Sequence, residues 1–267
     1  MIMQYIVGVI GRTWWQLSQL FAVPIVLAMA LQWVGGQIRR CGAGWLGDTY
    51  WYIVSPGVAC HETGHAVGCL ISGCKIHEFV PFTRRYDDKL GYVTHERKRG
   101  LWGGVASFII SSGPVWFGCL MIALLSRCFG GVVRMARYGD FFANDAMPNV
   151  AEYVCGLVNA ASRLLTTLFV DGTWGWGFAL WFYLVFCIAS EIGLSKVDLQ
   201  HMWRGMAMIA LAFLGFNLIP VVGKWVSAGM FVALPWFFKL HVLMLAALVL
   251  NVALLLLTRL VTWLRFH

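Results

Sequence analysis

The sequence predicts an all-α polytopic membrane protein with about six transmembrane helices and one small β-hairpin. Of its 267 residues, 60% are hydrophobic and 12% are charged, and soluble domains carry about twice that charged fraction. Apolar runs recur along the chain, and their length is close to the roughly 20 residues that a helix needs to cross a bilayer. One polar stretch between two of these runs shows strand-like composition. The bilayer is therefore the expected environment and partner of this chain.

The predicted spans lie near residues 14–34, 51–73, 102–126, 175–195, 203–222 and 228–258. The segment 150–170 is also apolar, but it contains Glu152, Asn159 and Arg163. That polarity favours an interfacial or re-entrant amphipathic helix over a seventh span. Neither a repeat nor a low-complexity tract divides the chain, so we expect residues 1–267 to form a single membrane-embedded domain.

The net charge of +8 reflects membrane topology rather than a nucleic-acid partner. The basic residues occur in short tracts between apolar runs, not on one basic helix face. Residues 74–99 contain seven Lys and Arg residues, so the positive-inside rule predicts that this segment is cytoplasmic. With six spans both termini are then cytoplasmic, and Arg39 falls on the opposite side. Without a signal-peptide pattern, a prokaryotic plasma membrane is the simplest location.

The hairpin is predicted from two runs rich in β-branched and aromatic residues, "KIHEFVPF" at 75–82 and "LGYVTHE" at 90–96. The polar turn "TRRYDDK" separates them, which is the pattern of two short antiparallel strands. An exposed strand edge can hold an extended polypeptide by adding it to the sheet. An ordinary surface hairpin is an equally good interpretation.

The run "HETGH" at residues 61–65 places two histidines and a glutamate inside the second apolar run. Residues four apart share a helix face, so His61 and His65 can bind one metal ion with Glu62 beside it. With a third protein ligand, a zinc ion keeps a position for water and lowers the pKa of that water, and Glu62 can take its proton. We therefore expect one Zn²⁺ per chain, with His61 and His65 as ligands and Glu62 as the general base.

Other readings of the same residues are a structural hydrogen-bond network between helices, or a metal site without catalysis. A membrane metal-ion transporter or sensor would also use these histidines. It would need further carboxylates or histidines along a path through the membrane. The apolar runs contain few beyond Glu191 and Asp198, so the hydrolytic enzyme is the favoured hypothesis.

The segments "HETGHAVGCLISGCKIHEF", "LGYVTHE" and "IISSGPVWFGCLMIALL" together resemble the site-2 protease family of intramembrane zinc metalloproteases. The likeness consists of an H-E-x-x-H helix, a hairpin with a GYV-like strand and a next helix with a Gly-Pro turn, here Ser112-Gly113-Pro114. It covers about residues 51–126. It implies a zinc endopeptidase that cleaves membrane-spanning or membrane-associated protein substrates within or close to the bilayer.

The resemblance breaks down at the third zinc ligand. In that family the ligand is an aspartate in an N-x-x-P-x-x-x-x-D-G-like turn of a later helix. Asn217 and Pro220 match the start of that turn, but Trp225 stands where the aspartate belongs.

The better candidate lies in "ASEIGLSKVDLQHM", residues 189–202. Asp198 follows Ser190 by eight residues, the offset that separates Asn and Asp in the family's turn. We therefore expect Asp198 to be the third ligand. Glu191 would be better placed if the helix continued unbroken through Lys196, and His201 is a further alternative.

Overall fold

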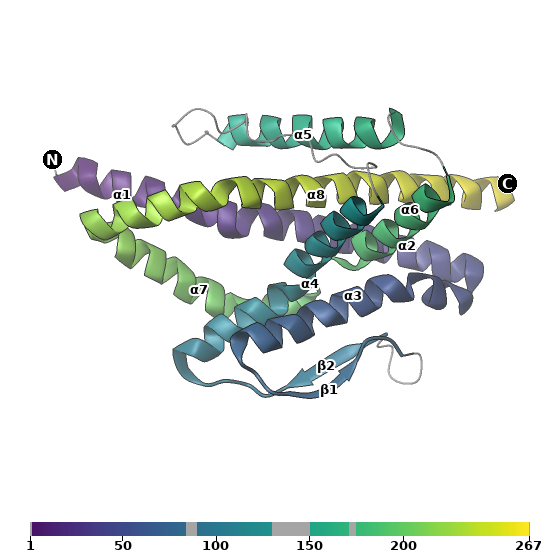
Figure 1. Ribbon diagram of the computed structural model, residues 1–267, viewed down its shortest axis with the longest axis horizontal. Coiled ribbons are helices and arrows are strands. Elements are labelled where there is room, and N and C mark those ends of the chain that lie inside the picture. Colours follow the sequence, from purple (N-terminus) through teal and green to yellow (C-terminus); the bar gives the residue numbers. More distant parts are fainter. Residues whose placement is uncertain (1, 84–89, 130–149, 171–174, 267) are drawn as a thin grey trace.

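The computed structural model describes residues 2–83, 90–129, 150–170 and 175–266, and most of them are helical (Figure 1). The elements are α1 (Ile2–Leu17), the π-helical turn η1 (Ser18–Ala22), α2 (Val23–Leu46), α3 (Thr49–Ser72), β1 (Ile76–Val80), β2 (Tyr92–His95), α4 (Gly100–Cys128), α5 (Val150–Val170), α6 (Trp176–Glu191), α7 (Lys196–Leu218) and α8 (Pro220–Phe266). The all-α class and the hairpin agree with the sequence prediction.

The predicted number of six spans is not supported. Within the described residues, three helical stretches are long and apolar enough to cross a membrane: Ile2–Leu46, Gly100–Cys128 and Pro220–Leu264. A fourth arises if α6 and α7, bent by 67° at their junction, count as one span. The runs predicted separately at 175–195 and 203–222 thus form a single bent pair. The run predicted as a span at 51–73 forms α3, which is not among these candidates. Its two histidines and Glu62 lower the hydropathy of the helix. Three or four candidate spans still fit an integral membrane protein.

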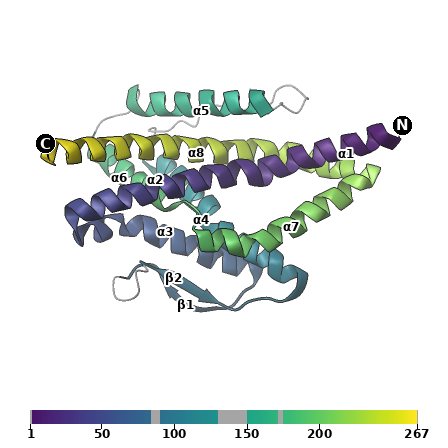
Figure 2. The same cartoon turned by 180° about the vertical axis from the view of Figure 1, so that it is seen from behind.

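The termini lie at opposite ends of the long axis, as the two ribbon views show (Figures 1 and 2). The 47-residue α8 accounts for much of this length, because a helix of that size is about 70 Å long. That is more than twice the thickness of a bilayer's hydrocarbon core. The cytoplasmic placement of both termini stays a prediction.

The β-hairpin and α5 lie on opposite sides of the helical body (Figures 1 and 2). β1 and β2 pair antiparallel, with Phe79 opposite Val93 and an irregularity between Ile76 and Glu78. Most of the predicted turn lies outside the described residues. On the other side α5 packs against α8 through one buried face, which includes Tyr153 and Leu157. Glu152, Asn159 and Arg163 of α5 are exposed, as expected of an amphipathic helix.

Small residues bring the helices that surround the site into close contact. A Cβ added to Gly64 of α3 would lie 2.8 Å from the backbone of both Gly113 and Pro114 in α4. On α7, a Cβ added to Gly205 would lie 2.6 Å from Cβ of Phe108 and 3.0 Å from backbone carbon of Gly104. Such approaches are how helices pack tightly inside membranes. They place α3 and α7 against the same helix, α4.

The chain breaks its helix between α6 and α7. α6 ends at Glu191 and α7 begins at Lys196, with Ser195 as the N-cap. Gly193 lies in this break, where an added Cβ would be 2.6 Å from Cα of Gln32 on α2. A side chain here would collide with α2, so glycine permits the connection. The alternative of a helix that continues through Lys196 is wrong.

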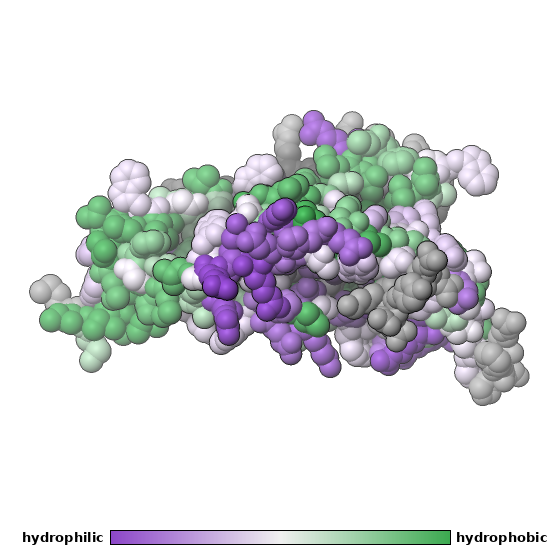
Figure 3. Space-filling view, turned by 90° about the horizontal axis from the view of Figure 1, so that it is seen from below, coloured by the Kyte–Doolittle hydropathy of each residue, from purple (hydrophilic) through white to green (hydrophobic). Residues whose placement is uncertain are grey.

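The surface is divided between a polar region and an apolar end. Seen from the hairpin side, hydrophilic residues gather over the hairpin, while the end that holds α1 is hydrophobic (Figure 3). Large exposed apolar side chains occur there on α1, α7 and α8, among them Ile2, Leu211 and Trp225. This distribution suits a body that is partly in contact with lipid and partly with water.

The contact between α4 and α7 gives a stability prediction. Gly205→Ala should destabilise the fold by about 1–3 kcal/mol, because the new methyl group meets α4 backbone and Phe108. Gly215→Ala is the matched control on the same helix, where nothing lies within 4 Å of the added Cβ, and it should be neutral or slightly stabilising because alanine favours helix. Thermal unfolding in detergent measures both. Equal melting temperatures would contradict the close packing of α4 and α7.

Candidate metal centre

Three side chains from two helices converge on one point. The potential ligand atoms of His61 and His65 on α3 and of Asp198 on α7 all lie within 4.8 Å of one another. The two histidine Nε2 atoms are 3.2 Å apart, and His65 Nε2 is 3.4 Å from Asp198 Oδ1. Tetrahedral ligands about 2.0–2.1 Å from a zinc ion are separated by about 3.3 Å. The group therefore has the dimensions needed to hold a metal ion.

Both imidazole rings are oriented by backbone carbonyls. His61 Nδ1 lies 2.6 Å from the carbonyl oxygen of Glu191, and His65 Nδ1 lies 2.8 Å from that of Ile110. A carbonyl only accepts, so each Nδ1 carries a hydrogen, and in a neutral ring Nε2 then keeps its lone pair. Two lone pairs facing each other at 3.2 Å repel unless they share a cation. Metal-binding histidines typically donate their other ring N–H to a carbonyl or carboxylate in this way.

The carbonyl that orients His65 is free because of a proline. In an α-helix the carbonyl of Ile110 would accept from the backbone N–H of residue 114, but residue 114 is proline and has no N–H. His65 supplies the missing donor. Because Gly64 and Gly113 let the two backbones approach, the imidazole can reach this carbonyl. The Gly-Pro pair in α4 thus has a direct role in building the site.

The carbonyl that orients His61 is free because a helix ends. Glu191 is the last residue of α6, and the final carbonyls of a helix have no partner within it. His61 donates to this terminal carbonyl. The end of α6 therefore contributes to the site through its backbone.

Asp198 is held by a capping box at the start of α7. The Oδ2 atom of Asp198 accepts hydrogen bonds from the backbone N–H of Ser195 at 2.9 Å and from its hydroxyl at 2.6 Å. In return, Ser195 Oγ accepts from the backbone N–H of Asp198 at 3.1 Å. These bonds cap the helix and fix the carboxylate. They leave Oδ1 directed toward His65.

The two alternative ligands lie outside this group. The carboxylate of Glu191 forms an ion pair with Arg39 of α2 at 2.7 Å, so Glu191 serves the site with its carbonyl only. Arg39 thus lies within reach of the end of α6 that orients His61, and the membrane side predicted for it stays a prediction. His201 is exposed and is not part of the group.

Glu62 lies where α3 meets the hairpin. A Cβ on Gly91 would be 2.8 Å from Cγ of Glu62 and 2.9 Å from the carbonyl oxygens of Val80 and Pro81. Only a residue without a side chain fits between the glutamate and the hairpin backbone. The "LGYV" run is thus placed directly beside the predicted general base.

The turn that matches the family's motif is remote from this group. Asn217 is buried and donates to Thr13 Oγ1 at 3.0 Å and to Gln16 Oε1 at 2.6 Å on α1. It lies nineteen residues after Asp198, which corresponds to about 28 Å along α7. Trp225 is 77% exposed. Asn217 therefore joins helices at the far end of α7.

The chain matches no family model, and neither a curated protein nor a solved structure is found to match it.

Sequence reasoning did not identify the carbonyls of Ile110 and Glu191 or the role of Ser195. Two of these left a signal in the sequence. A proline at position 114 in a predicted helix indicates a free carbonyl four residues earlier. The Ser-x-x-Asp spacing at 195–198 indicates a helix N-terminus, because acidic residues are favoured there. The partner of Glu191 depends on tertiary contact and left no such pattern.

The role of Pro114 can be tested by restoring the missing N–H. In Pro114→Ala the new backbone donor competes with His65 for the carbonyl of Ile110, so we expect metal affinity to fall about 10- to 100-fold. Pro235→Ala is the matched control, because it restores an N–H inside α8 and should leave the affinity unchanged. Competition with a fluorescent zinc chelator measures both. An unchanged affinity in Pro114→Ala would show that this carbonyl does not orient His65.

Proposed function

We propose that the chain is an intramembrane zinc metalloprotease that hydrolyses peptide bonds of membrane-associated protein substrates. The observation that carries the proposal is the convergence of His61, His65 and Asp198 with Glu62 next to the first ligand on the same helix. A structural metal site needs the ligands alone. A carboxylate at this position is what a hydrolytic site adds.

Zinc is the metal that the donor set favours. Two imidazoles and one carboxylate from the protein are typical of catalytic zinc sites, in which a fourth position stays open to water or substrate. A zinc ion bound there supplies Lewis-acid chemistry: it lowers the pKa of a water molecule and polarises a peptide carbonyl. The carbonyls of Ile110 and Glu191 hold the imidazoles in the tautomer that this binding requires.

Glu62 is the proposed proton carrier. Its carboxylate would accept the proton of the attacking water and then donate it to the amine that leaves the cleaved peptide bond. The absence of a side chain at Gly91 lets the hairpin backbone lie against Glu62. A polypeptide added to an edge of this two-stranded sheet would therefore be guided toward the carboxylate.

A metal-ion transporter or sensor remains the second candidate from the sequence. Transport requires successive binding sites along a path. Among the residues that the structure describes, His61, His65 and Asp198 form one such group, and no second group of three ligands accompanies it. This favours chemistry at a single site.

The proposal is tested by zinc content and proteolysis of the same detergent-purified variants. We expect about one zinc per chain in wild type and in Glu62→Gln, and loss of zinc in Asp198→Ala. Glu191→Gln should keep zinc because only its carbonyl serves the site. Incubation with a mixture of single-span membrane proteins should yield new peptide ends with wild type, detected by mass spectrometry. The rate at which these new ends form should fall at least about 100-fold in Glu62→Gln, since the proton acceptor is lost.

Glu96→Gln is the matched control, because Glu96 is an exposed glutamate just beyond β2 and its loss should change neither readout. A wild type without zinc would remove the basis of the proposal. Equal proteolysis by wild type and Glu62→Gln would exclude Glu62 as the base. Uptake of zinc into proteoliposomes by a zinc-binding protein without proteolysis would support the transporter.

A further inference from the structure

One face of α2 lies against the break between α6 and α7. Gln32, Gly35 and Arg39 recur every three to four residues of α2, so they share this face. Gln32 lies against Gly193 of the break, and Gly35 lets the carbonyl of the residue before Glu191 approach. Arg39 Nη1 donates a hydrogen bond to Glu191 Oε2 at 2.7 Å. The end of α6 and the break therefore contact α2 at three successive positions.

Glu191 is contacted from α3 as well. Its carbonyl oxygen lies 2.6 Å from His61 Nδ1. One turn earlier on the same face of α3, a Cβ added to Gly57 would lie 3.0 Å from Cγ of Glu191. The side chain of Glu191 thus passes Gly57 on its way to Arg39. Arg39 and His61 contact opposite ends of the same residue.

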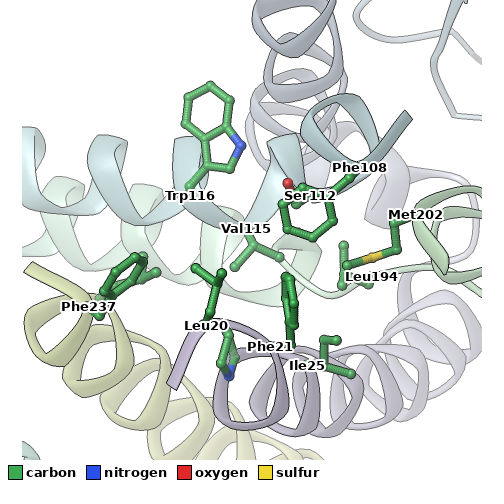
Figure 4. A pocket seen from close by; sticks show the side chains of 12 residues that line it. Leu20, Phe21, Ile25, Phe108, Ser112, Val115, Trp116, Leu194, Met202 and Phe237 are labelled. Carbon is green, nitrogen blue, oxygen red and sulfur yellow. The ribbon is translucent and has the colours of Figure 1, made fainter. Parts of the chain in front are cut away.

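The next part of the break lies in an apolar region. Leu194 lines a cavity of about 160 Å³ together with Ile25 of α2 and Met202 of α7 (Figure 4). Side chains around a cavity lose contacts that close packing would provide, and the hydrophobic effect has no direction that could fix a carbonyl. The ion pair of Arg39 and Glu191 is directional, so it can fix the backbone at the end of α6.

We propose that Arg39 is a positioning residue of the metal centre. By pairing with Glu191, it holds the end of α6 where the carbonyl of Glu191 orients His61. The inference rests on the proposed function, because His61 must bind zinc, and it adds a residue of a third helix to the site. Helix ends fray, and their last carbonyls have no partner within the helix. An anchor on α2 keeps this terminal carbonyl in place as an acceptor.

A purely structural role for the ion pair makes a different prediction. The side chains of Arg39 and Glu191 are only 20% and 11% exposed, so loss of one partner leaves a buried charge and destabilises the fold. Replacing both by apolar residues of similar length removes that cost, but it also removes the anchor. The double variant Arg39→Met/Glu191→Met therefore separates the two roles. It also retains a Cγ atom beside Gly57.

The experiment measures zinc affinity and thermal unfolding of the full-length protein in detergent. Competition with a fluorescent zinc chelator should show about tenfold weaker binding in the double variant than in wild type, because an orienting partner of a metal-binding histidine is no longer fixed. The melting temperature should stay close to that of wild type. The absorption spectrum of the Co²⁺-loaded double variant should also change, because it reports the geometry of the ligands.

Two further variants define the effect. Glu191→Gln keeps a side-chain oxygen that accepts from Arg39, so it should bind zinc about as tightly as wild type. Arg40→Met is the matched control, because it makes the same replacement at the next position of α2, where the side chain is exposed. It should change neither zinc affinity nor the Co²⁺ spectrum.

Wild-type zinc affinity in the double variant would overturn the proposal. So would an affinity that follows the melting temperature through Arg39→Met and the double variant, because the pair would then stabilise the fold without positioning His61. An equal loss of affinity in Arg40→Met would also contradict a specific role of Arg39.

The zinc content of wild type separates this inference from the proposed function. A wild type without zinc contradicts the proposed function itself. A wild type that binds zinc, together with a double variant that binds it equally well, contradicts only the role of Arg39.

Discussion

The candidate metal centre depends on two places where a helix leaves a backbone carbonyl without its usual partner. At one, Pro114 frees the carbonyl of Ile110; at the other, α6 ends and frees the carbonyl of Glu191. Each carbonyl accepts a hydrogen bond from one histidine. A buried carbonyl without a partner costs about 1–3 kcal/mol, and so does an unpaired imidazole N–H. Pairing them removes both costs. It also fixes the orientation of the two imidazole rings, so that their Nε2 atoms face each other.

The break after Glu191 also determines which carboxylate faces the histidines. If the helix continued, Asp198 would lie further along the same axis and Glu191 would be the nearer acid. Instead, the chain bends by 67°, Ser195 starts a new helix, and its capping box turns Asp198 toward His65. The carboxylate of Glu191, left on the other side of the break, is neutralised by Arg39. Because of this four-residue interruption, Asp198 faces the histidines while Glu191 pairs with Arg39.

The parts of this arrangement that follow local rules were predictable from the sequence. The His-Glu-x-x-His spacing and the alternating strands of the hairpin each carry information within a few residues. Asp198 was expected instead from the offset of the family's turn, with Glu191 and His201 as alternatives. The number of spans was not predictable in the same way. The apolar composition of 175–195 and of 203–222 indicates a separate span for each. That the two helices form one bent pair depends on Gly193 fitting against Gln32 of α2. The partners of Glu191 and Asn217 likewise come from distant helices, so periodicity along the chain says nothing about them.

The position of Glu62 connects the site to the polar face of the molecule. Hydrolysis requires water to reach Glu62, although α3 is surrounded by apolar helices. The hydrophilic region of the surface lies over the hairpin, on the side of Glu62 (Figure 3). Gly91 brings the hairpin backbone against Glu62. In the proposed enzyme an extended substrate paired with the hairpin would then reach Glu62 from the hairpin side. A peptide held there would lie beside both the proposed proton acceptor and the first metal ligand, because Glu62 and His61 are neighbours on α3.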